Sequence, residues 1–140
     1  MSKKEEAILL KMKIADAFMN EISTLIQNKF YNTAINRLYY SCYHATRALL
    51  LTKGLAPKTH KRVNSLLHQE FVQKDLFNLQ RAYFFSALMD ERNESDYGDF
   101  LIFDEKDISE FIQSAREYLE YVRILVDYFL TAQKTNSTSE

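Results

Sequence analysis

The chain has 140 residues, the length of a single domain, and 46% of them are hydrophobic, which is enough for a packed core. With 2 glycines and 1 proline it lacks the turn residues of an all-β domain, and a net charge of -1 excludes a global field toward nucleic acid or membranes. Its single cysteine, Cys42, excludes an internal disulfide, and no apolar run is long enough for a membrane span, so we expect a cytoplasmic protein.

Apolar residues recur every three or four positions in the first half of the chain, which predicts amphipathic helices over residues 4–28 and 31–53. Gly54 is placed to end the second helix, because glycine adopts a left-handed backbone without strain. Pro57 then prevents the helix from continuing. Cys42 lies on the apolar face of the second helix, and we expect it to be buried.

Three more helices are predicted in the second half of the chain, over residues 59–73, over residues 75–92 and from Asp104 onward. The stretch at residues 82–89 is apolar nearly all round, so its helix lies centrally or in an oligomer interface. Residues 133–140 are polar. We therefore predict one helical-bundle domain over residues 1–132 and a C-terminal tail over 133–140.

No stretch of the sequence alternates apolar and polar residues with a period of two, so we predict no sheet. Four long helices joined by short connections predict an all-α fold, an antiparallel up-and-down four-helix bundle. The helix over residues 59–73 would be a short fifth helix beside that core.

The second predicted helix carries Arg37, Tyr40 and His44 in one stripe, roughly opposite its apolar face. One interpretation is a solvated or interface surface. The other is the polar wall of a cleft, in which Arg37 binds an anion and His44 transfers a proton. No carboxylate in this helix lies within reach of His44 to orient it.

A second candidate is the dense basic cluster of Lys58, His60, Lys61 and Arg62. It falls at the predicted start of a helix, where the helix dipole favours anions and disfavours cations. Cations in that place suit a bound phosphate or a nucleic-acid backbone. A solvated surface is the alternative.

Arg92 lies in an acidic segment that runs from Asp90 to Phe100. It would serve either as an ion-pair partner or as a functional group. Asp96 and Asp99 lie three residues apart without a nearby histidine, which is a weak metal signal. The chain also lacks a phosphate-binding glycine loop and zinc-ligand spacing, so we expect neither a metal nor a cofactor.

Three motifs in this order resemble the HEPN superfamily of small helical-bundle proteins. They run from Asn36 to Leu50, from Gly54 to His60 and from Arg92 to Phe100, so the resemblance covers the chain from the second helix to the last. It implies a bundle that dimerises. In the ribonuclease members, an arginine and a histidine a few residues later meet across the dimer cleft. They cut RNA without metal, with the ribose 2′-hydroxyl as nucleophile.

Arg92 matches the family arginine, whereas Tyr97 stands in the position of the histidine. These two residues are the candidate catalytic pair. A phenol has a reference pKa of about 10 and is a poor proton carrier near neutral pH. His44 or His60 would replace the histidine only if folding brings it close to Arg92. We therefore favour a binding protein over an enzyme.

Many prokaryotic members of the family pair with a minimal nucleotidyltransferase as toxin and antitoxin. In some of them the transferase adenylylates a tyrosine two residues past the histidine, where this chain has Asp99, so that Tyr97 is the nearest acceptor. We expect a homodimer that binds a nucleotide, RNA or a partner protein in a toxin–antitoxin-like system. The alternatives are a metal-independent endoribonuclease with a degenerate motif and a structural dimer or adaptor.

Overall fold

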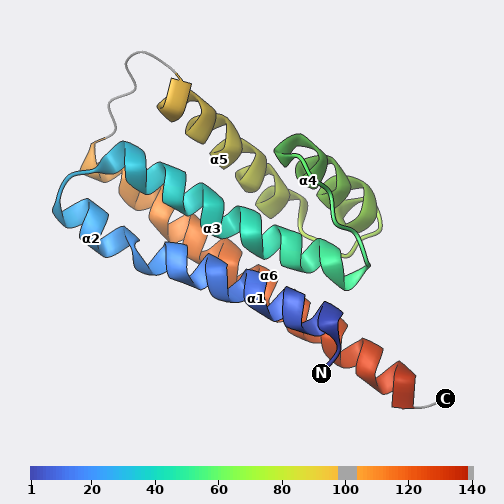
Figure 1. The fold of residues 1–140 in the computed structure, drawn as a ribbon. Coiled ribbons are helices and arrows are strands. Elements are labelled where there is room, and N and C mark those ends of the chain that lie inside the picture. Colours follow the sequence, from blue (N-terminus) through green and yellow to red (C-terminus); the bar gives the residue numbers. More distant parts are fainter. Residues whose placement is uncertain (98–103, 139–140) are drawn as a thin grey trace.

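The computed structural model describes residues 1–97 and 104–138, and the side chains of residues 1–93 and 104–133. Within these ranges every regular element is helical, which confirms the predicted all-α fold (Figure 1). In chain order the elements are α1 (Lys3–Asn20), α2 (Ile22–Gln27), α3 (Tyr31–Thr52), α4 (His60–Leu67), the π-helix η1 (His68–Val72), α5 (Leu79–Tyr97) and α6 (Glu105–Thr138).

Helix α3 is the centre of the bundle. It runs between α1 and α2 on one side and α4 and α5 on the other, and it also packs on α6 (Figure 1). The four long helices α1, α3, α5 and α6 alternate in direction, with α4 and η1 as the short addition. The centre of α3 is fully buried at Leu38, Tyr39 and Leu49, because it meets neighbours on several sides. Cys42 is buried there as expected.

Short polar side chains define where several helices begin. Thr59 accepts a hydrogen bond from the N–H of Arg62 at 3.1 Å, and Asn78 accepts one from the N–H of Arg81 at 2.9 Å. These caps satisfy N–H groups that have no partner inside the first turn. They fix the residues at which α4 and α5 begin. Gly54, with φ +75°, follows the end of α3 as predicted.

The boundaries of two predicted helices are wrong. The helix predicted over residues 4–28 is interrupted at Glu21, whose N–H bonds to the carbonyl of Phe18 three residues back. The apolar spacing continues across this tightened turn and hides it. The helix predicted over residues 75–92 begins at Leu79, because Asp75 has φ +58° and Asn78 is the cap, and it continues to Tyr97.

Helix α6 continues to Thr138, through the polar stretch that begins at residue 133. Its C-terminal end extends past the neighbouring helices (Figure 1). The division into a domain of residues 1–132 and a tail stays a prediction. Among the described helices, none is both long and apolar enough to cross a membrane.

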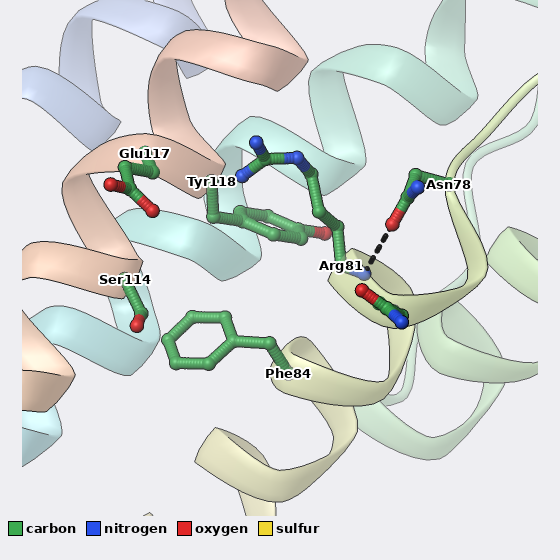
Figure 2. A pocket seen from close by; sticks show the side chains of 7 residues that line it. Asn78, Arg81, Phe84, Ser114, Glu117 and Tyr118 are labelled. Atoms are coloured by element: carbon green, nitrogen blue, oxygen red, sulfur yellow. Dashed lines mark hydrogen bonds between the residues drawn. The ribbon is translucent and has the colours of Figure 1, made fainter.

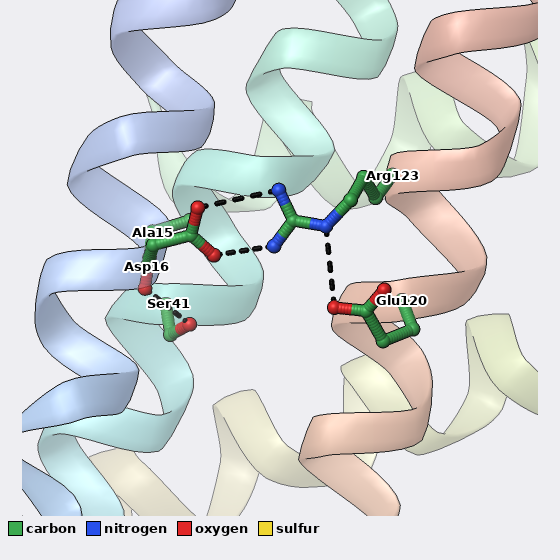
Figure 3. Close-up of polar contacts among 5 residues, drawn as sticks. All are labelled: Ala15, Asp16, Ser41, Glu120 and Arg123. Carbon is green, nitrogen blue, oxygen red and sulfur yellow. Dashed lines mark hydrogen bonds and ion pairs between the residues drawn. The ribbon is translucent and has the colours of Figure 1, made fainter.

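Polar contacts tie α1 to its two neighbours (Figure 3). The buried Ser41 hydroxyl donates to the carbonyl of Ala15 at 2.7 Å and joins α3 to α1. Arg123 of α6 donates to both carboxylate oxygens of Asp16 on α1 and to Glu120 at 3.2 Å. These bonds hold α1 in register, so that its side chains reach a defined part of the α3 surface.

Candidate anion-binding site

Arg92 lies near the end of α5 and faces the aromatic side chains of α3. Its Nη2 donates a hydrogen bond to the Tyr40 hydroxyl at 3.0 Å. The guanidinium carbon lies 5.4 Å from the centre of the Tyr40 ring and 5.6 Å from that of Tyr39, within the range of cation–π attraction. Because 52 residues separate Arg92 from Tyr40, the packing of α5 on α3 makes this contact rather than any local motif.

His60, the first residue of α4, packs against the same aromatic side chains. Its Nδ1 lies 2.7 Å from the Tyr39 hydroxyl, and its ring stacks on Tyr43 with the centroids 4.3 Å apart. Burial lowers the pKa of His60, and the positive charges of Arg92 and Arg47 lower it further. The fold therefore brings a histidine close to Arg92, although the two are 32 positions apart in the sequence, at 60 and 92.

His44 lies one turn beyond Tyr40 on α3. Its ring stacks on Phe18 of α1, with the planes 8° apart and the centroids at 5.7 Å. Nδ1 is buried, and none of the described residues offers it a hydrogen-bond partner. Burial lowers the pKa of this imidazole, and so do the nearby basic groups of Arg47, Lys11 and His60. The neutral form is therefore favoured near pH 7 in the absence of an anion.

Two further basic side chains belong to this surface, and neither was among the sequence-predicted residues. The guanidinium carbon of Arg47 lies 5.6 Å from the centre of the Tyr43 ring. Lys11 reaches the site from α1, and its pKa is lowered by burial and by Arg47. We call this set the basic face; it consists of Lys11, His44, Arg47, His60 and Arg92.

The basic face gathers basic side chains from four helices, α1, α3, α4 and α5. Within the described part of the chain, Lys11, Arg47 and the two histidines form no ion pair with a carboxylate. Cations held together in this way repel one another, and a bound anion would relieve the repulsion. Since the whole chain has a net charge of -1, this concentration of positive charge is local.

Arg37 has a different environment from the rest of its predicted stripe. Its Nε lies 2.9 Å from a carboxylate oxygen of Glu21, and its guanidinium carbon lies 5.7 Å from the Phe18 ring centre. The carboxylate already neutralises the guanidinium. His44 belongs to the basic face and Tyr40 adjoins it, whereas anion binding by Arg37 stays a prediction.

The predicted cluster at the start of α4 also divides. His60 packs against α3, whereas Lys58, Lys61 and Arg62 are exposed. Anion binding by these three stays a prediction. The backbone of Tyr97 is the last turn of α5, but its side chain lies outside the described residues, as does Asp99.

A separate pocket of about 350 Å³ lies between the start of α5 and the middle of α6 (Figure 2). Its lining combines polar and aromatic side chains, namely Asn78, Gln80, Arg81, Phe84, Ser114, Glu117 and Tyr118. It shares no residue with the basic face. No cluster of three or more histidine, cysteine, aspartate or glutamate side chains among the described residues is placed to hold a metal.

Sequence spacing could have revealed one of the missed residues. Arg47 extends the stripe of Tyr40 and His44 by one helical turn, which makes it a neighbour of His44. Lys11 carries no such signal, because its position depends on how α1 packs on α3. Tyr39 adjoins the predicted stripe, but its contact with His60 spans 21 residues and a helix junction.

The fold and the site define the class of this protein: it is a helical bundle with a basic surface that lies against aromatic side chains. The family model of the HEPN domain matches residues 9–125, a stretch that contains the whole basic face. The chain belongs to the HEPN family.

Relatives with known names support this assignment. The chain is 28% identical over 127 residues to a "UPF0332 protein" of Thermotoga maritima, covering 91% of this chain and 96% of that one. It is 29% identical over 83 residues to "Putative toxin MJ0142" of Methanocaldococcus jannaschii, which covers 59% of this chain and 56% of that protein. A second protein of this archaeon, "Putative toxin MJ0605", is 38% identical over 69 residues, 49% of this chain and 52% of its own length.

Proposed function

We propose that this HEPN protein binds the phosphate groups of RNA or of a nucleotide at its basic face, as a component of a toxin–antitoxin-like system. The observation that carries the binding proposal is the convergence of basic side chains from four helices on a chain with a net charge of -1. The names of the two Methanocaldococcus jannaschii relatives support the toxin–antitoxin context.

Phosphate suits this surface because its charged oxygens accept hydrogen bonds from arginine, lysine and imidazole N–H groups. The aromatic rings behind Arg47 and Arg92 limit the freedom of both guanidinium groups before a ligand arrives. A bound anion would also favour the charged form of His44. Because burial and nearby basic groups lower the pKa of His44 in the ligand-free protein, affinity should rise as the pH falls below about 6.5, the ordinary pKa of histidine.

The binding proposal is tested by measuring the fluorescence anisotropy of a labelled single-stranded RNA at several salt concentrations. Replacing Arg47 with alanine should weaken binding and reduce the slope of log K against log salt by about 0.7 for each phosphate that the protein no longer neutralises. Arg116→Ala is the matched control, because it removes the same charge from an exposed position on α6. Equal effects of the two changes would reject the basic face as the site. If the basic face is the site, competition by ATP would distinguish a nucleotide-binding site from a site that requires an RNA chain.

The second candidate is a metal-independent endoribonuclease with a degenerate motif, and one observation favours it. His60 and Arg92 both contact the rings of Tyr39 and Tyr40. Burial lowers the pKa of His60, and the charge of Arg92 lowers it further. An imidazole can exchange protons near neutral pH, while an arginine stabilises negative charge that develops on a phosphate. Binding remains our first proposal, because Tyr97 stands where the ribonuclease members have histidine.

RNA cleavage in excess chelator distinguishes the two candidates. We expect little cleavage by the unmodified protein near pH 7 and a gain on Tyr97→His. Adding Arg92→Ala to that variant should abolish the gain. Robust cleavage by the unmodified protein that is abolished in both Arg92→Ala and His60→Ala would make the enzyme the primary function.

A homodimer and a nucleotidyltransferase-type partner are part of the same proposal. The apolar stretch of α5 at residues 82–89 divides in the structure, with Phe85 and Leu88 buried and Tyr83 exposed by 60%, and Leu79, one turn before Tyr83, is exposed by 46%. These two exposed side chains lie one turn apart and would pack against a second protein. Light scattering at micromolar concentration should give about twice the 16.5 kDa chain mass, and a monomer would contradict the dimer.

A further inference from the structure

Tyr39 is a fully buried tyrosine beside the basic face. Burial raises the pKa of its phenol far above the ordinary value, so the hydroxyl keeps its hydrogen at physiological pH. The hydroxyl oxygen lies 2.7 Å from Nδ1 of His60, which joins α3 to the first residue of α4.

The direction of this hydrogen bond follows from counting donors and acceptors. A hydroxyl and an imidazole nitrogen can share either the hydroxyl hydrogen or a hydrogen on Nδ1. In the second case the buried hydroxyl of Tyr39 would need another acceptor, and among the described residues it has none within hydrogen-bond distance. A buried donor without an acceptor is costly. The Tyr39 hydroxyl therefore donates, and Nδ1 of His60 accepts.

A neutral imidazole that accepts at Nδ1 carries its hydrogen on Nε2. Stacking on Tyr43 at 4.3 Å and an edge contact with Tyr40 at 5.9 Å fix the plane of the His60 ring. The tautomer and the ring plane are therefore both set before any ligand binds.

We propose that Tyr39 is a positioning residue for His60: its hydroxyl fixes the tautomer that presents Nε2–H to a phosphate oxygen bound beside Arg92. This inference rests on the proposed anion-binding function and adds a role for a buried residue that does not touch the ligand.

The charges around His60 favour the neutral donor in the absence of ligand. Arg92 faces it from α5 and Arg47 from α3, and burial acts in the same direction on its pKa. His44 on α3 is a further basic neighbour, since each imidazole would repel the charge of the other. Without the bond from Tyr39, the neutral ring could place its hydrogen on either nitrogen.

The first experiment reads the tautomer directly from the nitrogen chemical shifts of the imidazoles at about pH 8, where free histidine is neutral. In the unmodified protein we expect His60 to carry its hydrogen on Nε2. Tyr39→Phe keeps the ring and removes the donor, so this preference should disappear. Tyr43→Phe is the control, because it keeps the stacked ring and the Tyr39 hydrogen bond. An Nδ1–H tautomer in the unmodified protein, or an unchanged tautomer in Tyr39→Phe, would overturn the proposal.

The second experiment measures binding of the labelled RNA, with circular dichroism melts to show that each variant is folded. Tyr39→Phe should weaken binding by about two- to tenfold, the range expected for one hydrogen bond. His60→Gln places an amide N–H near the Nε2 position and should bind better than His60→Asn, whose amide reaches only the Nδ1 position.

The two measurements separate the inference from the function on which it rests. Unchanged RNA affinity in Tyr39→Phe, with an altered tautomer, would overturn the positioning role and leave anion binding intact. An unmodified protein that binds no RNA or inorganic phosphate at low salt would reject the proposed function, and the Tyr39 hydroxyl would then be structural whatever the tautomer.

Discussion

The arginines in two clusters of charged side chains have different partners in this protein. On α6, Arg123 donates hydrogen bonds to Asp16 and Glu120, and these bonds raise its pKa (Figure 3). In the basic face, Arg47 lies against an aromatic ring, and within the described residues it has no carboxylate partner. Its charge instead lowers the pKa of its neighbours, as it does for Lys11.

The difference supports a structural role for the cluster at Arg123 and the proposed ligand-binding role for the basic face. Asp16 and Arg123 are 107 residues apart, so their bond closes the bundle between its first and last long helices. Its charges are already balanced. The like charges of the basic face repel one another, and the buried aromatic rings beside them do not neutralise this repulsion. Shifted pKa values of this kind are more frequent at functional sites than elsewhere, because function requires the charge to be there.

The largest expected effect is the loss of RNA binding after a charge reversal in the basic face. Arg47→Glu should weaken binding of the labelled RNA by about tenfold or more, or about 1.4 kcal/mol, because it replaces an attraction for phosphate by a repulsion. It should leave the free energy of unfolding unchanged or higher, since it reduces repulsion within the basic face. Fluorescence anisotropy and urea unfolding measure the two quantities.

Arg123→Glu is the matched reversal, and we expect the opposite pattern from it. It places a third carboxylate beside Asp16 and Glu120, so the protein should become less stable while the RNA affinity of the folded protein stays the same. If both reversals weakened binding equally, the comparison between the two clusters would fail.

The next effect, on stability, is smaller. Arg123→Ala should lower the free energy of unfolding by about 1 kcal/mol, the upper end for a partly exposed ion pair with good geometry. Arg47→Ala should lower it by less or raise it slightly, because no carboxylate is left without its partner. Urea titrations at low and high salt measure both, and the destabilisation in Arg123→Ala should shrink as salt increases. A larger destabilisation in Arg47→Ala would show that the basic face is structural.

The sequence was sufficient to predict the bundle but not the position at which its first helix is interrupted. The repeated apolar spacing of Ile8, Met12 and Ala15 predicts a helix, and all three side chains are buried. The same spacing continues through Ile22 and conceals the interruption at Glu21, where a single backbone hydrogen bond shifts to a residue three back. Such a local change leaves no mark on the apolar pattern.

The site was predictable only where one helix supplies it. Tyr40 and His44 share a stripe of α3, and their neighbourhood follows from helical geometry alone. The contact of Arg92 with Tyr40 depends instead on how α5 packs on α3. The neutralisation of Arg37 depends on the turn at Glu21. Side chains that meet across helices are set by packing, which the periodicity of each helix does not contain.

The third prediction concerns pH. The pKa values of His44 and His60 are lowered in the folded protein, so below about 6.5 the unfolded chain binds more protons than the folded one. The contribution of these histidines to stability is therefore fully present above about pH 6.5 and decreases as the pH falls. Thermal melts between about pH 7.5 and pH 5.5 should show this decrease, and His44→Gln should flatten it.

Adding RNA provides the control for the pH prediction. An anion at the basic face favours protonated His44, so the melting temperature should depend less on pH in its presence. A stability that rises as the pH falls over the same range would contradict the neutral state of both imidazoles.

The smallest expected effect comes from Lys11→Met, which keeps the length of the side chain and removes one charge from the basic face. The pKa of His44 should rise, because Lys11 is one of the basic groups that lower it. Stability should change by less than about 0.5 kcal/mol. Imidazole proton shifts followed through a pH titration measure the pKa. Lys13→Met is the matched control, since Lys13 is an exposed residue of the same helix. If both variants moved the pKa of His44 equally, Lys11 would act only through the overall charge and would not belong to the basic face.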